Sequence, residues 1–316
     1  MNRSRAATTF SRSLRRAGLL ALLWAGALHA QTSLYVTVGP YFYRFNAVTG
    51  APIAAPLGNT NSFTWQSALD GQGRLYVALS GQQNVGVYDA STGATINRAF
   101  LDTGINSPSA LGLWNGTLYV ASQSQQRIST YDAGTGALLN ANFIANLYVP
   151  EYLAFDASGR LFVSNGDGTV GLFDAASGAV INRNFITGLS SPMGLALDGA
   201  GRLFVASVQG NKVSVFDATS GALLNSSLIA GLGSPRALAL DASGALYVGS
   251  YNAGGGYYEV GRYDSATGAA LNAHLLLNGG SISSLNLQAV PEPATWACLA
   301  LGLAWLGCRF RARRVS

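Results

Sequence analysis

Acidic and hydroxyl side chains recur at a fixed spacing along most of this chain, in a pattern typical of calcium loops or of tight turns. The string Asp-Ala-x-Thr/Ser-Gly, or a close variant, appears at 46–50, 89–93, 132–136, 174–178, 217–221 and 264–268. A calcium loop needs several alternating acids around one ion, and each string supplies only one Asp or Asn. An Asp that accepts hydrogen bonds from the next backbone N–H groups explains the pattern better, so we expect a turn.

Few other side chains of residues 31–289 are suited to acid, base or nucleophilic chemistry. His274 is the single histidine of this stretch, and the two cysteines, Cys298 and Cys308, lie beyond it. This composition excludes a thiol nucleophile, a disulfide framework and a histidine-based metal site within one chain. His274 has no evident partner in the sequence, and no Ser-His-Asp triad can be assembled from it.

The charge distribution argues against nucleic acid as a partner. The net charge of +5 arises from nine arginines at the two ends, and the stretch between them holds ten cations against thirteen acids. A nucleic-acid-binding protein needs a basic face. The central part of the chain is slightly acidic, and we expect no nucleic-acid partner.

The elements that must position these residues are short strands. Aligned on the Asp-Ala-x-Thr/Ser-Gly string, units of 42 to 47 residues each contain four segments rich in Val, Leu, Ile, Phe and Tyr, as in 191–198, 201–207, 211–217 and 221–229. Gly, Asp, Asn and Ser separate the segments, which is typical of hairpin turns. Four antiparallel strands per unit, repeated six times, predict a six-bladed β-propeller.

The two ends of the array predict how the ring closes. The first unit lacks its first strand, and the final segment, 281–288, matches only that strand. A C-terminal strand that joins the N-terminal blade would remove the open sheet edges. The units also resemble NHL and YVTN-type propeller repeats, for example over 201–224. That resemblance implies the architecture, and propellers of this kind bind proteins, sugars or nucleic acids, while a few are enzymes.

Candidate ligand-binding positions lie where the innermost strands begin, at one mouth of the expected channel. The repeat frame is constant around this position, while the position itself varies through Trp65, Ser109, Glu151, Met193, Arg236 and Ser283. Glu151 and Arg236 could together orient a polar ligand. The alternative interpretation treats both as solvated charges at the rim.

A channel-bound metal is the second hypothesis. Propellers that resemble gluconolactonases hold a metal with Glu, Asn and Asp oxygens, and the candidates here are Glu151, Asn165 and Asp167. Positions equivalent to Asn165 hold Leu79, Ser122, Ser207 and Ser250, so the channel supplies few hard-oxygen ligands. We therefore expect no metal and no cofactor. A metal-dependent lactonase, hydrolase or lyase that acts on sugars remains the alternative function.

The two ends of the chain resemble targeting signals. Residues 1–30 combine an Arg-rich start with a short apolar run and small residues, as secretory signal peptides do. Residues 290–316 contain Pro291-Glu292-Pro293, an apolar run of fifteen residues, and a terminal basic cluster of Arg309, Arg311, Arg313 and Arg314. This order resembles a PEP-CTERM sorting tail, which implies a Gram-negative bacterium and processing by an exosortase.

The expected organisation is therefore a signal peptide (1–30), an all-β propeller (31–289) and a sorting tail with a hydrophobic helix (290–316). Fifteen apolar residues are too few for a permanent membrane anchor, so we expect contact with the membrane only through this tail. The resemblance implies delivery to the cell surface or extracellular matrix. There we expect a non-catalytic binding or scaffold module for a glycan or protein ligand.

Overall fold

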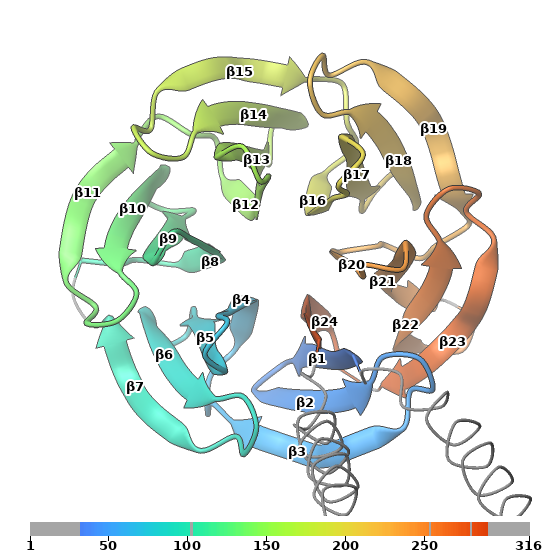
Figure 1. Cartoon of the computed structure of the whole chain (residues 1–316), viewed down its shortest axis with the longest axis horizontal. Helices are drawn as coiled ribbons and strands as arrows, with labels where there is room; N and C mark the ends of the chain where they lie inside the picture. The colour runs from blue at the N-terminus through green and yellow to red at the C-terminus, as the bar shows by residue number, and fades with distance from the viewer. Residues whose placement is uncertain (1–31, 102–103, 253, 279, 290–316) are drawn as a thin grey trace, which may run out of the picture. The chain divides into compact units, whose positions relative to one another are not determined.

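The computed structural model describes residues 32–101, 104–252, 254–278 and 280–289. Residues 1–30 and 290–316, where the sequence predicts a signal peptide and a sorting tail, fall outside these ranges. Within them, 24 strands form six four-stranded antiparallel sheets that are arranged as the blades of a ring (Figure 1). Residues Leu34–Gln288 make up one compact unit. No helix among the described residues has the length and apolar character needed to cross a bilayer.

Each blade contains one inner strand next to the central channel and one outer strand at the circumference. Blade 1 contains β24 (Ile282–Ala289), β1 (Thr32–Val38), β2 (Tyr41–Asn46) and β3 (Pro52–Asn59). Blade 2 contains β4 (Thr64–Leu69), β5 (Arg74–Leu79), β6 (Asn84–Asp89) and β7 (Thr95–Leu101). Blade 3 contains β8 (Pro108–Trp114), β9 (Thr117–Ser122), β10 (Arg127–Asp132) and β11 (Leu138–Ile144).

The remaining blades repeat the same order. Blade 4 contains β12 (Pro150–Phe155), β13 (Arg160–Asn165), β14 (Thr169–Asp174) and β15 (Val180–Ile186). Blade 5 contains β16 (Pro192–Leu197), β17 (Arg202–Ser207), β18 (Lys212–Asp217) and β19 (Leu223–Ala230). Blade 6 contains β20 (Ala237–Leu240), β21 (Ala245–Asn252), β22 (Tyr257–Asp264) and β23 (Ala270–Asn278). We call the face at which the inner strands begin the upper face, and the opposite one the lower face.

The predicted ring closure is confirmed. Strand β24, from the end of the described chain, pairs with β1 and completes the first blade (Figure 1). The Tyr35 hydroxyl donates to Oε1 of Gln288 at 3.0 Å, and Ser283 Oγ donates to the Thr37 carbonyl at 3.2 Å. No blade is left with an inner edge strand missing, so the ring has no gap at its junction.

The turn interpretation of the repeated Asp is also confirmed. Asp174 Oδ1 accepts from Ser177 N at 2.8 Å and from Ser177 Oγ at 2.6 Å, and blades 2, 3, 5 and 6 repeat both bonds. In blade 1, Asn46 Oδ1 accepts from backbone N–H groups alone. Gly178, which ends the turn, has φ +74°, and a Cβ on it would lie 2.4 Å from the carbonyl oxygen of Phe143 in the preceding blade. The glycine therefore serves both the left-handed backbone and the close approach of two blades.

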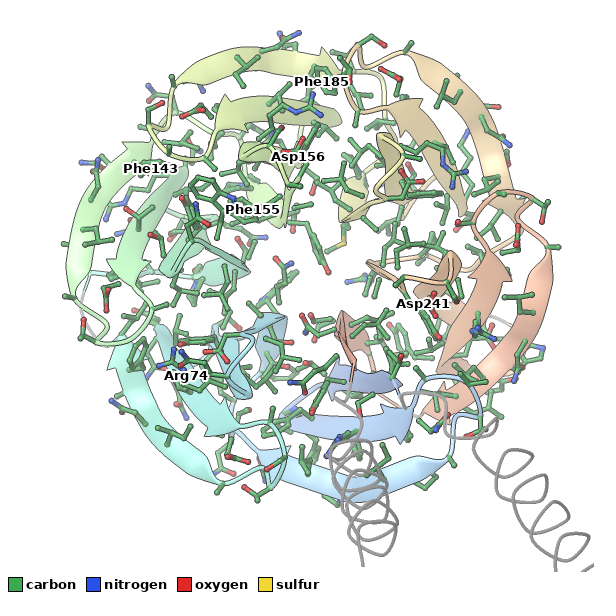
Figure 2. All side chains as sticks on the ribbon, in the orientation of Figure 1. Arg74, Phe143, Phe155, Asp156, Phe185 and Asp241 are labelled. Atoms are coloured by element: carbon green, nitrogen blue, oxygen red, sulfur yellow. The ribbon has the colours of Figure 1, made fainter. Side chains whose placement is uncertain are left out.

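The core lies between blades and not within a single sandwich. Five of the second strands carry a buried aromatic residue at the same position, each preceded by a buried leucine: Tyr76, Tyr119, Phe162, Phe204 and Tyr247. Tyr119 packs against Phe143 and Phe155, with ring centroids 5.5 and 4.9 Å apart, and Figure 2 shows side chains filling the spaces between neighbouring blades. Both faces of each sheet are therefore apolar, as propeller packing requires.

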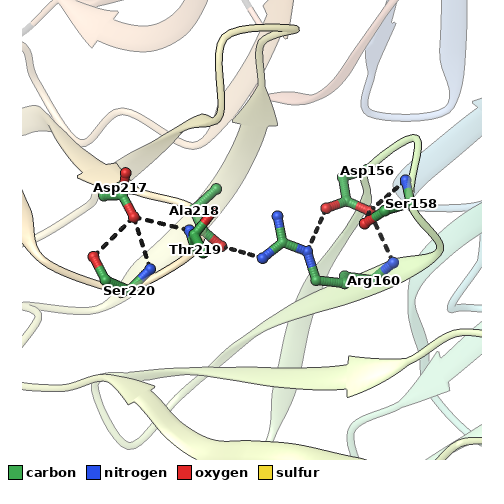
Figure 3. A network of polar contacts seen from close by, with 7 residues as sticks. All are labelled: Asp156, Ser158, Arg160, Asp217, Ala218, Thr219 and Ser220. Atoms are coloured by element: carbon green, nitrogen blue, oxygen red, sulfur yellow. Dashed lines mark hydrogen bonds and ion pairs between the residues drawn. The ribbon is translucent and has the colours of Figure 1, made fainter.

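Neighbouring blades are also joined by hydrogen bonds to one repeated carbonyl, that of the residue after the turn Asp. Tyr76 and Tyr119 donate their hydroxyls at 2.6 Å to the carbonyls of Ala133 and Ala175 in the next blade. In blades 4 and 5 an arginine replaces the tyrosine as donor. Arg160 Nη1 reaches the Ala218 carbonyl at 2.7 Å, while its Nε binds Asp156 (Figure 3).

Polar side chains from different blades meet between the inner strands, part of the way along the central channel. Gln66 of β4 accepts from Leu111 N at 3.1 Å, and it is buried. The Tyr152 hydroxyl of β12 faces Gln66 and Ser284; burial raises the pKa of Tyr152 to about 12, against the lowering effect of these two partners. Below this cluster, a cavity of about 360 Å³ is lined by the last residues of the inner strands, Leu69, Leu113, Phe155, Leu197, Leu240 and Leu287.

Candidate functional site

The six predicted channel-mouth residues lie at equivalent places on the upper face, near the start of each inner strand. Five are in their inner strands, and Arg236 directly precedes β20, where its N–H donates to the Gly249 carbonyl at 2.9 Å. Ser109 is buried and the other five are half-buried: Trp65, Glu151, Met193, Arg236 and Ser283. The frame therefore brings six different side chains to one mouth of the channel.

Two of these side chains are used by the frame. Ser109 Oγ donates to the carbonyl of Pro150, 2.6 Å away in the next blade. Ser283 Oγ donates to Thr37 in the neighbouring strand of its own blade. Both hydroxyls therefore stabilise the ring. The side chains of Trp65 and Met193 make no hydrogen bond to a described residue, although the Met193 backbone carbonyl accepts from Ser164 Oγ at 2.8 Å.

Glu151 and Arg236 interact across the mouth. Burial raises the pKa of Glu151, while the hydrogen bond from Gln123 Nε2, 2.9 Å long, and the positive charge of Arg236 act in the opposite direction. The Arg236 Nε is buried and has no hydrogen-bond partner among the described residues. A half-buried acid and a half-buried base thus share this mouth, and both are less solvated than ordinary rim charges.

The metal candidates do not converge. Asn165 and Asp167 both bind Thr169 of their own hairpin, through Asn165 Nδ2 at 3.2 Å and Asp167 Oδ1 at 2.7 Å. Glu151 is held instead by Gln123 of blade 3. Across the described part of the chain, no three His, Cys, Asp or Glu side chains are grouped so as to hold a metal ion.

Sequence reasoning was wrong about His274. Its Nδ1 lies 2.6 Å from Oε2 of Glu259, whose side chain is 10% exposed, while the His274 side chain is 58% exposed. Asn252 Nδ2 donates to the same carboxylate at 3.3 Å. The partners come from β21, β22 and β23 of blade 6, so only the sheet pairing brings them together, and no sequence motif indicates it.

The upper face also carries aromatic side chains that the sequence analysis missed. Of the described aromatic residues, three are exposed: Tyr41 at 37%, Phe63 at 76% and Tyr148 at 57%. Each lies in a hairpin or connection of the upper face, and the lower face has no equivalent among the described residues. Phe63 occupies the position that holds Ser107, Val149, Ser191 and Ser234 in four other blades. This departure from the repeat frame is the signal that could have found it.

Comparisons with known proteins support the architecture. No family model matches the chain, and no curated protein matches it. A chain from the crystal structure of a nidogen/laminin complex is 14% identical with a TM-score of 0.66, over 82% of this chain and 99% of that one. A Bacteroides caccae protein of unknown function gives 16% identity and a TM-score of 0.62, over 81% of this chain and 98% of that one.

A computationally designed protein, Ika8, is also similar, with 14% identity and a TM-score of 0.53 over 82% of this chain and 92% of the other. At these identities the likeness concerns the fold alone. The chain is therefore an all-β, six-bladed propeller built from four-stranded antiparallel blades.

Proposed function

We propose that this protein is an exported, non-catalytic binding module whose upper face holds a glycan or protein ligand at the cell surface or in the extracellular matrix. The observation that carries the proposal is the asymmetry between the two faces. The exposed aromatic side chains and the interacting pair Glu151 and Arg236 all belong to the upper face. Rigid aromatic surface beside a few polar groups is typical of binding sites.

The structural neighbours are compatible with this role. One comes from a complex of nidogen with laminin, so a ring of this fold takes part in a protein assembly there.

The proposal that the protein is delivered to the cell surface rests on the two ends of the chain. Residues 1–30 would direct export, and the segment from Pro291-Glu292-Pro293 to Arg314 would be processed by an exosortase at the membrane.

Binding is tested with the labelled full chain on an array of oligosaccharides and of extracellular matrix proteins. Replacing both Glu151 and Arg236 with Gln should weaken binding to the ligand found, because a half-buried charged pair orients polar groups. The free energy of unfolding should change by less than about 1 kcal/mol, because neither side chain is in the core. Unchanged binding by the double variant would show that Glu151 and Arg236 at the channel mouth do not bind the ligand.

Export is tested separately, by expression in a bacterium that has an exosortase. Mass spectrometry of the surface fraction should find a chain that ends near Pro291-Glu292-Pro293. An intact chain in the cytosol would refute the proposed localisation.

Metal analysis of the purified protein tests the alternative function, a metal-dependent enzyme. One tightly bound divalent ion per chain would favour a metal-dependent hydrolase.

A further inference from the structure

Phe63 is the most exposed aromatic residue of the described chain, and nothing in the fold requires it. It lies in the connection from β3 to β4, on the upper face, with 76% of its surface accessible. The equivalent position is Ser or Val in four other blades, so the repeat folds without an aromatic there. An exposed Phe in an otherwise permissive position points to a contact with something outside the chain.

The backbone that carries this ring is held rigidly. The Phe63 carbonyl accepts from Ser80 N at 3.1 Å and from Ser80 Oγ at 3.2 Å. On either side of it, Thr60 N donates to the Pro40 carbonyl at 2.8 Å, and Thr64 N donates to the Gly39 carbonyl at 3.3 Å. The connection is thus fastened to both neighbouring hairpins of the upper face. The backbone at Phe63 therefore needs little ordering when a ligand binds.

The surroundings of the ring are polar and uncharged. Phe63 borders a cavity of about 400 Å³ whose other lining residues are Pro40, Asn59, Asn61 and Ser62. The side-chain Oδ1 of Asn59 accepts from Asn61 N at 2.7 Å, which fixes the loop. The Asn61 side-chain amide makes no hydrogen bond to any described residue, so its donors and acceptor remain available. No charged side chain lines this cavity.

We infer that this cavity is a subsite for one pyranose ring of a neutral saccharide. A pyranose presents an apolar C–H face that can stack on the phenyl ring, and vicinal hydroxyls that match an amide's paired donor and acceptor. Its size fits a cavity of a few hundred Å³. An acidic or basic ligand would find no countercharge there. The inference rests on the proposed role of the upper face and names the class of ligand.

The experiment uses the purified full chain with maltotetraose, cellotetraose and chitotetraose as probes. Binding is measured by calorimetry, and saturation-transfer NMR identifies the sugar protons that contact aromatic protons. Phe63→Ser, which copies the residue of other blades, should weaken binding of the best probe about tenfold, the worth of one stacked aromatic contact. Asn61→Ala should weaken it less. Ile96→Ser, a change of an exposed apolar side chain on the outer strand β7, should leave it unchanged.

The outcomes separate the two proposals. Loss of saccharide binding in Phe63→Ser with retention in Ile96→Ser supports the subsite. Equal binding by Phe63→Ser and the unmodified chain overturns it, while loss in the Glu151 and Arg236 double variant would still support a ligand site at the mouth. If no probe binds and Phe63→Ser instead weakens binding of a matrix protein from the array, the subsite recognises protein and the saccharide inference is wrong.

Discussion

The interfaces between neighbouring blades, which we call seams, fall into two groups. At four consecutive seams, from blade 2 to blade 6, a side chain of one blade donates to the carbonyl after the turn Asp of the next, as Tyr119 does to Ala175 and Arg202 Nη1 does to Ser265 at 3.0 Å. At the two seams beside blade 1, the equivalent tyrosines use their hydroxyls elsewhere: Tyr247 binds Asp241 at 3.1 Å, and Tyr35 binds Gln288.

The difference shows that a ring made from one chain uses one kind of contact between its repeated blades and another kind where its two ends meet. Blades 2 to 6 follow each other in sequence, and each is joined to the next by a hydrogen bond to the equivalent carbonyl. Blade 1 is assembled from both ends, and its special contacts serve the junction itself. There Ser67 and Ser284 come within 3.1 Å, and Asn286 Nδ2 donates to Ser67 Oγ at 2.8 Å. Blade 1 is thus joined to its neighbour by local side-chain contacts that the other blades do not use.

The largest expected effect comes from breaking the closure. A chain that ends at Gly280 lacks β24 and with it the buried side chains of Ile282 and Leu285. It should lose at least about 4 kcal/mol of unfolding free energy, at about 2 kcal/mol for each side chain, and should aggregate through the exposed edge of β1.

The control is a chain that ends at Gln288, which keeps the strand. Urea unfolding followed by tryptophan fluorescence compares the two. If both unfold at the same urea concentration, β24 contributes nothing to closure and the distinction between the two kinds of seam fails.

A smaller effect should separate two interior seams that use the same donor. Tyr119→Phe removes a buried hydrogen bond to Ala175, and blade 3 has Thr117 where blades 2, 4 and 5 have arginine, so no second donor is present. The cost should be about 1 to 2 kcal/mol. Tyr76→Phe should cost less, because Arg74 stands two residues before it, ion-paired with Asp70 as Arg160 is with Asp156.

Chemical denaturation of both variants at equal ionic strength measures this difference. Equal costs would show that Arg74 does not replace the tyrosine as donor. The use of tyrosine in some blades and arginine in others would then make no difference to the free energy of unfolding.

The smallest effect concerns acid. Hydrogen bonds, first that of the Ser91 hydroxyl, lower the pKa of Asp89 to about 2, while blade 1 has Asn46 in the same turn. A carboxylate with a depressed pKa stabilises the fold above its unfolded pKa, near 4, and this contribution is lost as the pH falls toward 2.

Asp89→Asn should therefore reduce the loss of stability between pH 5 and pH 2, by less than about 1 kcal/mol because the side chain is exposed to solvent. Thermal unfolding across this range measures it. A variant as acid-sensitive as the unmodified chain would show that the turn aspartates of blades 2 to 6 do not differ in this respect from Asn46.

Most of the fold could be predicted because it is periodic. The six strings from Asn46 to Gly268 fix the number of blades, and the unmatched segment 281–288 fixes the closure, which the structure gives as β24. The extra residues of the 47-residue spacing belong to the longer hairpin of blade 6, in which β21 ends at Asn252 and β22 begins at Tyr257. Local residue types determine these features, so one sequence is enough.

The contacts that distinguish one blade from another could not be predicted in the same way. Glu259 and His274 meet through the pairing of β22 with β23, and Arg160 finds Ala218 only because two blades lie side by side. The mouth positions could be assigned from the frame, yet the burial that raises the pKa of Glu151 depends on neighbours from other blades. Phe63 departs from the frame that the repeats share, so the repeat pattern gives no indication of its exposure.

The polar cluster of Gln66, Tyr152 and Ser284 has a consequence for kinetics. Because these side chains come from blades 2, 4 and 1 and meet between the inner strands, we expect them to hinder a solute that moves along the axis from one face to the other. A molecule held at the upper mouth should then leave mainly toward the side from which it arrived. Its residence time is then governed by the loops of that side alone, and changes among the leucines around the lower cavity should leave its dissociation rate untouched.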